Sequence, residues 1–202
     1  MPKKIILAST SIYRKQLLEK TGLIFTIEKP SYDEEKAKLT AQTENRTALQ
    51  IAEILSKGKA KSLWNKADNQ NNLLIIAGDQ LVHFKGQILG KSKNFETAFA
   101  QLQRLNNQTH ELITALTLVC SEKVLHLNHI TTLKMKNLTV SEIENYLKRD
   151  QPYDCAGSYK IEESGITLFE KIDCSDFTAV QGIPMIWMTN QLKELGYEFF
   201  QG

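Results

Sequence analysis

A run of five apolar residues, Leu73–Ala77, is followed directly by Gly78, Asp79 and Gln80, and this junction constrains the fold more than any other part of the sequence. A short apolar run bounded by turn residues is typical of a buried strand. In α/β proteins the ends of buried strands are where ligands bind. The carboxylate of Asp79 therefore has two readings: it holds a divalent metal or takes a proton from water, or it only begins a turn.

Strands and helices alternate along the first half of the chain, and a long hairpin follows. Besides 73–77, we expect strands at Ile5–Ala8, Leu23–Glu28, Leu81–Phe84, Gln87–Lys91, Glu111–Cys120, Val124–Lys136 and Ile166–Ile172. Apolar spacing predicts helices from Ser11 to Gly22, 48 to 64, 95 to 105, 141 to 148 (opened by a Ser141–Glu144 capping box) and 184 to 195. Residues 31–43 are polar without a clear period, so we expect a loop there. This order predicts an α/β fold with a mixed sheet, and because no linker divides the chain, a single domain over residues 1–202.

Composition excludes several classes of protein. With 202 residues, 42% hydrophobic and 24% charged, the chain can bury a core without disulfides. A net charge of +2 gives no field that would attract nucleic acid or an anionic membrane, so a bound anion needs a local cluster of cations. No apolar run approaches the roughly 20 residues of a membrane helix. The odd count of 3 cysteines, without paired spacing, favours a reducing, cytoplasmic setting.

The first strand is followed by Ser9, Thr10 and Ser11, and Arg14 comes one turn into the next helix. Hydroxyls and free N–H groups at a helix start suit an anion, and an arginine adds a forked cation. The alternative is an ordinary N-cap, for which Ser11 is well placed, beside a solvated basic turn.

Three further charged positions have two readings each. Lys59 lies on the apolar stripe of its helix, so it either snorkels to the surface or faces a pocket. Lys91 ends a hairpin and is either a solvated turn residue or a ligand-binding cation. Glu34 lies in an acidic loop that is either merely solvated or joins Asp79 in holding Mg²⁺, which commonly takes one or two carboxylates with substrate phosphates.

The order of these segments carries more information than any one of them. They are Leu7–Arg14 (Leu-Ala-Ser-Thr-Ser-Ile-Tyr-Arg), Asp33-Glu34, Lys59-Ala60, Gly78-Asp79-Gln80, Gly90-Lys91, Cys155–Glu162 (Cys-Ala-Gly-Ser-Tyr-Lys-Ile-Glu), Gly165–Glu170 and Gly182-Ile183-Pro184. In order and spacing, from about residue 3 to about residue 196, the chain resembles the Maf family of nucleoside triphosphate pyrophosphatases. The resemblance implies an inosine-triphosphatase-like α/β fold, with a long mixed central sheet flanked by helices and two lobes with a cleft.

The same resemblance implies a reaction and a role for each matching residue. The reaction is hydrolysis of a nucleoside triphosphate to the monophosphate and pyrophosphate with a divalent cation, Mg²⁺ or Mn²⁺. Asp79 would accept a proton or bind the metal, and Glu34 would be a second metal ligand. The residues expected to hold the phosphates are Ser9, Arg14, Lys59 and Lys91. The implied partners are a nucleotide and, because family members are often dimers, a second copy of the chain, with no nucleic acid or membrane.

Three positions fall where the family sets base specificity, and here they are Tyr13, Gln80 and Glu162. An aromatic residue at the first and Glu at the last are similar to the branch that hydrolyses 7-methyl-GTP. Methylation makes guanine cationic, which favours an aromatic face and a carboxylate. The alternatives are the dTTP/UTP branch, which typically has Arg and Gln there, and a non-catalytic nucleotide-binding regulator of cell division.

The chain departs from the family pattern at three positions. Ile12 and Ser92 stand where proline is frequent, and Ile54 stands where the family often has arginine before the lysine motif. We expect only the change at Ile54 to weaken phosphate binding.

Overall fold

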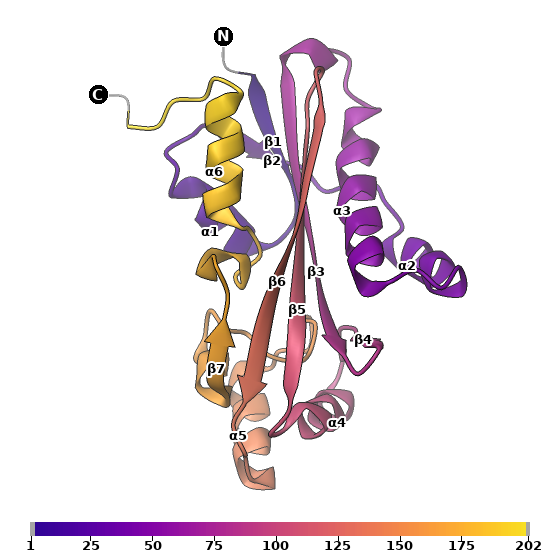
Figure 1. The fold of residues 1–202 in the computed structure, drawn as a ribbon, viewed down its shortest axis with the longest axis vertical. Helices are drawn as coiled ribbons and strands as arrows, with labels where there is room; N and C mark the ends of the chain where they lie inside the picture. The colour runs from indigo at the N-terminus through magenta and orange to yellow at the C-terminus, as the bar shows by residue number, and fades with distance from the viewer. Residues whose placement is uncertain (1–2, 201–202) are drawn as a thin grey trace. The chain divides into compact units, whose positions relative to one another are not determined.

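The computed structural model describes residues 3–200, which fall into two compact units. The first unit comprises residues 3–79, 114–129 and 176–200, and the second comprises 80–113 and 130–175. The helices are α1 (Ile12–Glu19), α2 (Glu34–Thr43), α3 (Ala48–Trp64), α4 (Phe95–Leu105), α5 (Val140–Asp150) and α6 (Met185–Glu194). The strands are β1 (Lys4–Ala8), β2 (Phe25–Ile27), β3 (Leu73–Phe84), β4 (Gln87–Leu89), β5 (Thr109–Val119), β6 (Val124–Met135) and β7 (Phe169–Asp173) (Figure 1). The expectation of one domain over 1–202 stays a prediction, and residues 1–2 and 201–202 of that span lie outside the described residues.

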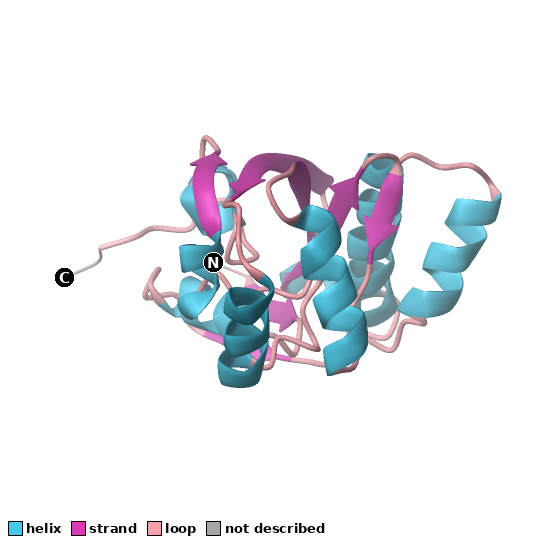
Figure 2. Ribbon diagram, turned by 90° about the horizontal axis from the view of Figure 1, so that it is seen from below, coloured by secondary structure: helices cyan, strands magenta, loops and turns pink. Residues whose placement is uncertain are grey.

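The strands belong to one hydrogen-bonded sheet with the order β2-β1-β3-β5-β6-β7, and β4 pairs with β3. β1 runs parallel to both β2 and β3, whereas the β3–β4 and β6–β7 pairs are antiparallel. Three strands, β3, β5 and β6, contribute residues to both units. Helices accompany the strands (Figure 2). This mixed α/β architecture confirms the fold class that the sequence predicts.

In the first unit, both faces of the sheet are covered, which explains the unbroken apolar run at 73–77. Leu74 and Ile76 join a buried cluster with residues of α1 and α6, including Leu18 and Met188. The alternate residues of the run, Leu73, Ile75 and Ala77, face the other way. They pack with Ala60 and Leu63 of α3. Figure 1 shows α1 and α6 on one side of β1 and β3 and α3 on the other. A strand buried on both faces needs apolar side chains at every position rather than alternation.

The expected break after Ala77 is wrong, because β3 continues through Gly78 and Asp79 to Phe84. Parallel pairing with β1 ends at the Ala8–Ala77 pair, so Asp79 lies just beyond the carboxyl end of β1 but inside β3. Glycine usually marks a turn or a close approach in a strand. At Gly78 the reason is a close approach, since an ideal Cβ would lie 3.0 Å from Nε of Arg14.

The expected loop at 31–43 is also wrong, because Glu34–Thr43 forms α2. Asp33 is its N-cap, and the side chain accepts a hydrogen bond from the backbone N–H of Lys36 at 3.0 Å. Only Ala41 of this helix is fully buried. A helix with so narrow an apolar face leaves no periodic signal, and the cap followed by acidic residues is its one sequence signature.

The strands expected at Leu23–Glu28 and Gln87–Lys91 are shorter, at Phe25–Ile27 and Gln87–Leu89, and two details of the second unit also differ from expectation. The capping box of α5 is formed by Thr139 and Glu142, not by Ser141 and Glu144. The strand expected from Ile166 begins at Phe169, because a 3₁₀ turn occupies Ser164–Leu168. The helices expected over 48–64, 95–105 and 184–195 are confirmed. A turn at 85–86, where both residues have positive φ, joins β3 to β4.

Within residues 3–200, no helix combines the length and apolar character needed to cross a membrane. The cysteines, Cys120, Cys155 and Cys174, are all free thiols.

The corrected cap of α5 gives a direct test. Thr139 Oγ1 accepts a hydrogen bond from the N–H of Glu142, whose carboxylate accepts one from the N–H of Thr139. We expect Thr139→Ala to lower the free energy of unfolding by about 1 kcal/mol, the usual cost of losing an N-cap. The matched variant Ser141→Ala, inside the first turn, should change it by less than about 0.5 kcal/mol. Urea denaturation of both variants measures the difference, and a larger loss for Ser141→Ala would contradict the assignment.

Candidate active site

A buried ion pair between Lys59 and Asp79 lies at the centre of the candidate site. Lys59 Nζ is 2.7 Å from Asp79 Oδ1, and the two side chains are only 9% and 8% exposed. Lys59 comes from α3 and Asp79 from β3, so the pair ties the helix to the strand. The snorkelling reading of Lys59 is therefore wrong, because its ammonium is buried, whereas its facing a ligand pocket stays a prediction.

Two more acceptors complete the surroundings of this ammonium. Glu34 Oε2 lies 2.8 Å from Lys59 Nζ, and the backbone oxygen of Gly78 lies 3.4 Å from it. A buried lysine needs such partners because removing an ammonium from water is costly. Glu34 differs from Asp79 in being half exposed, at 50%. Its contact with Lys59 is therefore the weaker of the two, since solvent screens exposed ion pairs.

The second oxygen of Asp79 has no protein partner. Oδ2 is buried and accepts no hydrogen bond from any described residue. An unsatisfied buried acceptor costs free energy and calls for an explanation. Lys59 occupies Oδ1, so Oδ2 is the atom left to receive a proton, a water or a metal ion.

The residues present fit a divalent cation bound together with a phosphate ligand. Asp79 and Glu34 supply two hard carboxylate donors that share one lysine. Among the described residues, no group of three or more His, Cys, Asp or Glu side chains is arranged to hold a metal. Mg²⁺ commonly takes one or two carboxylates, with waters and substrate oxygens completing its shell. The unpartnered Oδ2 of Asp79 agrees with that mode of binding.

Sequence reasoning missed two neighbours of this centre, Tyr32 and Lys38. Burial lowers the pKa of Lys38, while the negative charges of Asp79 and Glu35 act in the opposite direction. Burial also raises the pKa of Tyr32, and the charges of Glu34 and Asp79 add to the effect. The charge of the Asp79 carboxylate therefore acts on the pKa of both side chains. Lys38 was missed because residues 31–43 were expected to form a loop. Only in a helix do residues four apart, such as Glu34 and Lys38, lie on the same face.

Ser9 and Arg14 form a second group where β1 passes into α1. Ser9 Oγ accepts hydrogen bonds from the backbone N–H of Ser11 at 3.1 Å and from Arg14 NH1 at 3.4 Å. Ser11 is the N-cap of α1, as expected, and its hydroxyl accepts from the N–H of Arg14. The N-cap at Ser11 is thus confirmed, but the solvated basic turn is wrong at Arg14, which is half-buried and hydrogen-bonded to Gly182 and Ser9. The structure brings together the serine and arginine that the anion-binding reading requires.

Two glycines make room for the Arg14 side chain. Arg14 Nε donates a hydrogen bond to the backbone oxygen of Gly182 at 3.0 Å. An ideal Cβ at Gly182 would lie 3.1 Å from both Cγ and Nε of Arg14, and one at Gly78 would lie 3.0 Å from Nε. Gly182 also has φ +111°, which other residues rarely adopt. The arginine thereby lies beside the backbone that leads into Asp79.

The remaining predicted site residues are Lys91, Gln80, Glu162 and Tyr13, and of these only Gln80 is adjacent to Asp79 in the chain. Lys91 is exposed, and it forms an isolated antiparallel bridge with Ala156 in the second unit. This bridge places the Gly-Lys motif beside the Cys-Ala-Gly motif. Gln80 and Glu162 are half-buried in the same unit, and Tyr13 is half-buried in α1 of the first unit. The roles expected for Ser9, Arg14, Lys59, Lys91, Tyr13, Gln80 and Glu162 stay predictions.

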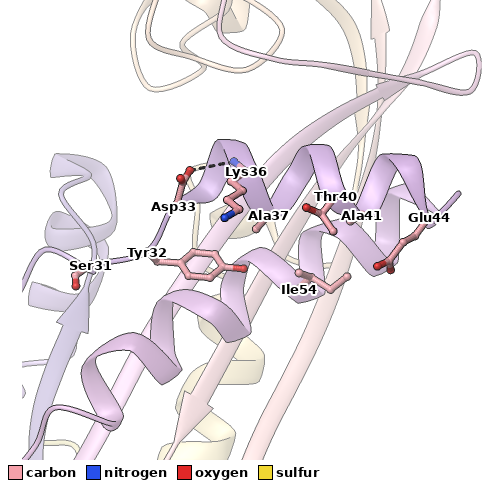
Figure 3. Close-up of a pocket in the computed structure, with 9 residues that line it drawn as sticks. All are labelled: Ser31, Tyr32, Asp33, Lys36, Ala37, Thr40, Ala41, Glu44 and Ile54. Carbon is pink, nitrogen blue, oxygen red and sulfur yellow. Dashed lines mark hydrogen bonds between the residues drawn. The ribbon is translucent and has the colours of Figure 1, made fainter.

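A pocket of about 470 Å³ lies between α2 and α3 in the first unit (Figure 3). Tyr32 and Ile54 line it together with one side of α2. Ile54 is thus directed toward this pocket, at the position where the family often has arginine. The expected weakening of phosphate binding by Ile54 stays a prediction.

Comparison with known proteins supports the assignment of these motifs. A family model described as Maf-like protein matches residues 4–195. A relative from Bdellovibrio bacteriovorus, named 7-methyl-GTP pyrophosphatase, is 44% identical over 92% of this chain and 94% of its own length. Relatives of the same name from Xanthomonas axonopodis and a Polaromonas species are 38% and 36% identical, each over 98% of this chain and over 99% and 87% of their own lengths.

Removing the buried ammonium tests the central ion pair. Lys59→Met keeps an unbranched apolar stem but leaves the Asp79 carboxylate buried without its partner, so we expect the free energy of unfolding to fall by roughly 3–5 kcal/mol. The matched variant is Lys57→Met on the same helix, whose half-exposed ion pair with Glu53 is worth less than about 1 kcal/mol. Urea denaturation at neutral pH compares them, and equal losses would show that the Lys59–Asp79 pair contributes no more than a surface pair.

Proposed function

This chain belongs to the Maf family, and on that premise we propose that it is a nucleoside triphosphate pyrophosphatase that cleaves 7-methyl-GTP into 7-methyl-GMP and pyrophosphate. The observation that carries the proposal is the Asp79 carboxylate, one oxygen of which is fixed by Lys59 while the other is buried without a protein partner. The names of the relatives from Bdellovibrio, Xanthomonas and Polaromonas support the substrate.

Asp79 is suited to assist the attack of water on phosphorus. Its Oδ2 is buried and has no hydrogen-bond partner among the described residues, so this oxygen has a lone pair free for a proton or a metal ion. The water oxygen forms a bond to phosphorus, its proton passes to a base, and the oxygen bridging the α- and β-phosphates leaves with the bonding electrons. Asp79 serves either as that base or as the ligand that orients the water.

Asp79 and Glu34 are the residues that would hold the divalent cation. When bound, Mg²⁺ or Mn²⁺ supplies positive charge against the phosphates and lowers the pKa of a coordinated water. Glu34, half exposed at the start of α2, is able to exchange its contact with Lys59 for one with an incoming ligand. Lys59 would then be shared between Asp79 and a phosphate oxygen.

We propose that the phosphate groups of the nucleotide are bound by Ser9, Arg14, Lys59 and Lys91. Arg14 is oriented in advance, because Nε is bonded to the backbone of Gly182 and NH1 to Ser9. A guanidinium held in a fixed plane binds phosphate oxygens with little further loss of side-chain freedom. Fixed cations of this kind stabilise the charge that develops on a phosphoryl group during transfer.

We assign base selection to Tyr13, Gln80 and Glu162. The cationic ring of 7-methylguanine is attracted to an aromatic face and to a carboxylate. Glu162 is able to accept hydrogen bonds from the N1–H and N2–H₂ edge of guanine, whereas thymine and uracil offer one such donor. We also propose a cytoplasmic location, in accord with three free thiols, and a homodimer, which rests on the family resemblance.

Replacing Asp79 tests the proposed chemistry. We expect Asp79→Asn to lower the kcat for pyrophosphate release from 7-methyl-GTP by about 10²–10⁴-fold, because the amide neither accepts the proton nor holds the cation. Pyrophosphate is measured with Mg²⁺ or Mn²⁺ present and again after chelation with EDTA, which should abolish the activity. Far-UV circular dichroism checks that the variant remains folded.

The matched pair Glu34→Gln and Glu35→Gln controls this experiment, because the two glutamates are neighbours in the first turn of α2 and Glu34 contacts Lys59. At a fixed, limiting Mg²⁺ concentration Glu34→Gln should lower the activity, and Glu35→Gln should retain it. Wild-type activity in Asp79→Asn would exclude its proposed role. A folded wild type that releases no pyrophosphate from any triphosphate would favour a nucleotide-binding regulator.

The double variant Tyr13→Arg/Glu162→Gln tests base selection. We expect the ratio of kcat/KM for 7-methyl-GTP to that for UTP and dTTP to fall at least about tenfold, which corresponds to roughly 1.4 kcal/mol of lost discrimination. A panel of methylated and unmodified triphosphates gives the order of preference for both proteins. If that order is unchanged, these residues do not select the base.

A further inference from the structure

Gly58 lies in the middle of α3, where glycine is among the least favourable residues. The usual reason for a glycine does not apply, because Gly58 is not among the residues with positive φ. Space is the reason instead. An ideal Cβ at Gly58 would lie 2.1 Å from Cζ of Tyr32 and 2.4 Å from its Oη, so the tyrosine ring occupies the place of a side chain at position 58.

Tyr32 belongs to the short segment that also carries Glu34. Asp33 stands between them as the N-cap of α2, and its carboxylate accepts a hydrogen bond from the N–H of Lys36. Figure 3 shows the Tyr32 ring in the space between α2 and α3, where it lines the pocket with Ile54. The ring therefore joins the start of α2 to the surface of α3.

The segment has two anchors on adjacent residues of α3. The ring of Tyr32 lies on Gly58, and the carboxylate of Glu34 contacts Lys59. The second anchor is weak alone, because a half-exposed glutamate has many rotamers and its ion pair is screened by water. A backbone fixed by the packed ring reduces the freedom that Glu34 loses on reaching Lys59.

We propose that Tyr32 is a positioning residue for Glu34: its ring packs on Gly58 and fixes the start of α2, so that the Glu34 carboxylate lies at Lys59 beside Asp79. The link to metal binding rests on the proposed function, whereas the packing of Tyr32 on Gly58 does not. A merely structural role for Tyr32 would affect stability and leave the response of the enzyme to metal unchanged.

Unfolding in urea tests the packing without reference to activity. Gly58→Ala should lower the unfolding midpoint in the wild type, because the added methyl group displaces the ring. In the Tyr32→Ala background the same substitution should raise the midpoint, because alanine is a better helix former and the space is empty. A change of the same sign in both backgrounds would overturn the packing of Tyr32 on Gly58.

The same cycle applied to Tyr32 and Glu34 tests the positioning. Glu34→Gln should lower the midpoint in the wild type and change it less in the Tyr32→Ala background, since the carboxylate no longer lies at Lys59 there. Equal shifts in both backgrounds would show that Tyr32 does not position Glu34.

The activity measurement is the Mg²⁺ concentration that gives half-maximal pyrophosphate release from 7-methyl-GTP. Tyr32→Ala and Gly58→Ala should each raise this Mg²⁺ concentration about tenfold, because even a small displacement of the Glu34 carboxylate weakens its contact with the metal. Tyr32→Phe keeps the ring and should restore the wild-type value. Combining Tyr32→Ala with Glu34→Gln should give no further rise beyond Glu34→Gln alone.

The two proposals fail in different ways. An active wild type whose Mg²⁺ requirement is unchanged by Tyr32→Ala and Gly58→Ala would overturn the positioning role and leave the proposed function standing. A wild type without pyrophosphatase activity would overturn the proposed function, and the two unfolding cycles would then decide the positioning role.

Discussion

The attraction between one buried ammonium and one buried carboxylate determines how the first unit is arranged. Lys59 and Asp79 are both more than nine-tenths buried, and neither charge is tolerable there alone. Helix α3 must therefore lie against β3 with Lys59 opposite Asp79. The start of α2 must then bring Glu34 to the same ammonium. The pair leaves Asp79 Oδ2 unpartnered, so the interaction that secures the fold also leaves an acceptor available for chemistry.

The packing around this pair depends on the absence of side chains at particular positions. Gly78 and Gly182 leave space for the stem of Arg14, and Gly58 leaves space for the ring of Tyr32. In each case a large side chain from another element fills the space. The arginine and the tyrosine therefore pack against the backbone of glycine residues. Backbone moves less than a side chain, so these contacts fix their positions more firmly than contacts with another side chain would.

Sequence reasoning succeeded where burial leaves a pattern and failed where it does not. The stripe of α3 and the apolar run of β3 are dictated by cores on both faces of the sheet, so periodicity predicted them. Helix α2 buries almost nothing, and its polar sequence gave no period from which to predict it or the location of Lys38. Gly78 resembled a turn because the arginine that requires it is distant in the sequence. The matching motifs assigned Asp79 and Glu34 to the metal and Lys59 to the phosphates of one site, which their local patterns alone did not do. The contacts of Lys59 with both carboxylates were not predicted.

The hydrogen bond from Arg14 to Gly182 joins residues 168 positions apart in the chain. During synthesis Arg14 leaves the ribosome 168 residues ahead of its backbone acceptor. Contacts between such distant residues form late and slowly, because a long loop must close first. A nascent chain that does not yet contain Gly182 therefore has the arginine but not its fixed orientation, so this part of the site forms later than the helix that carries Arg14.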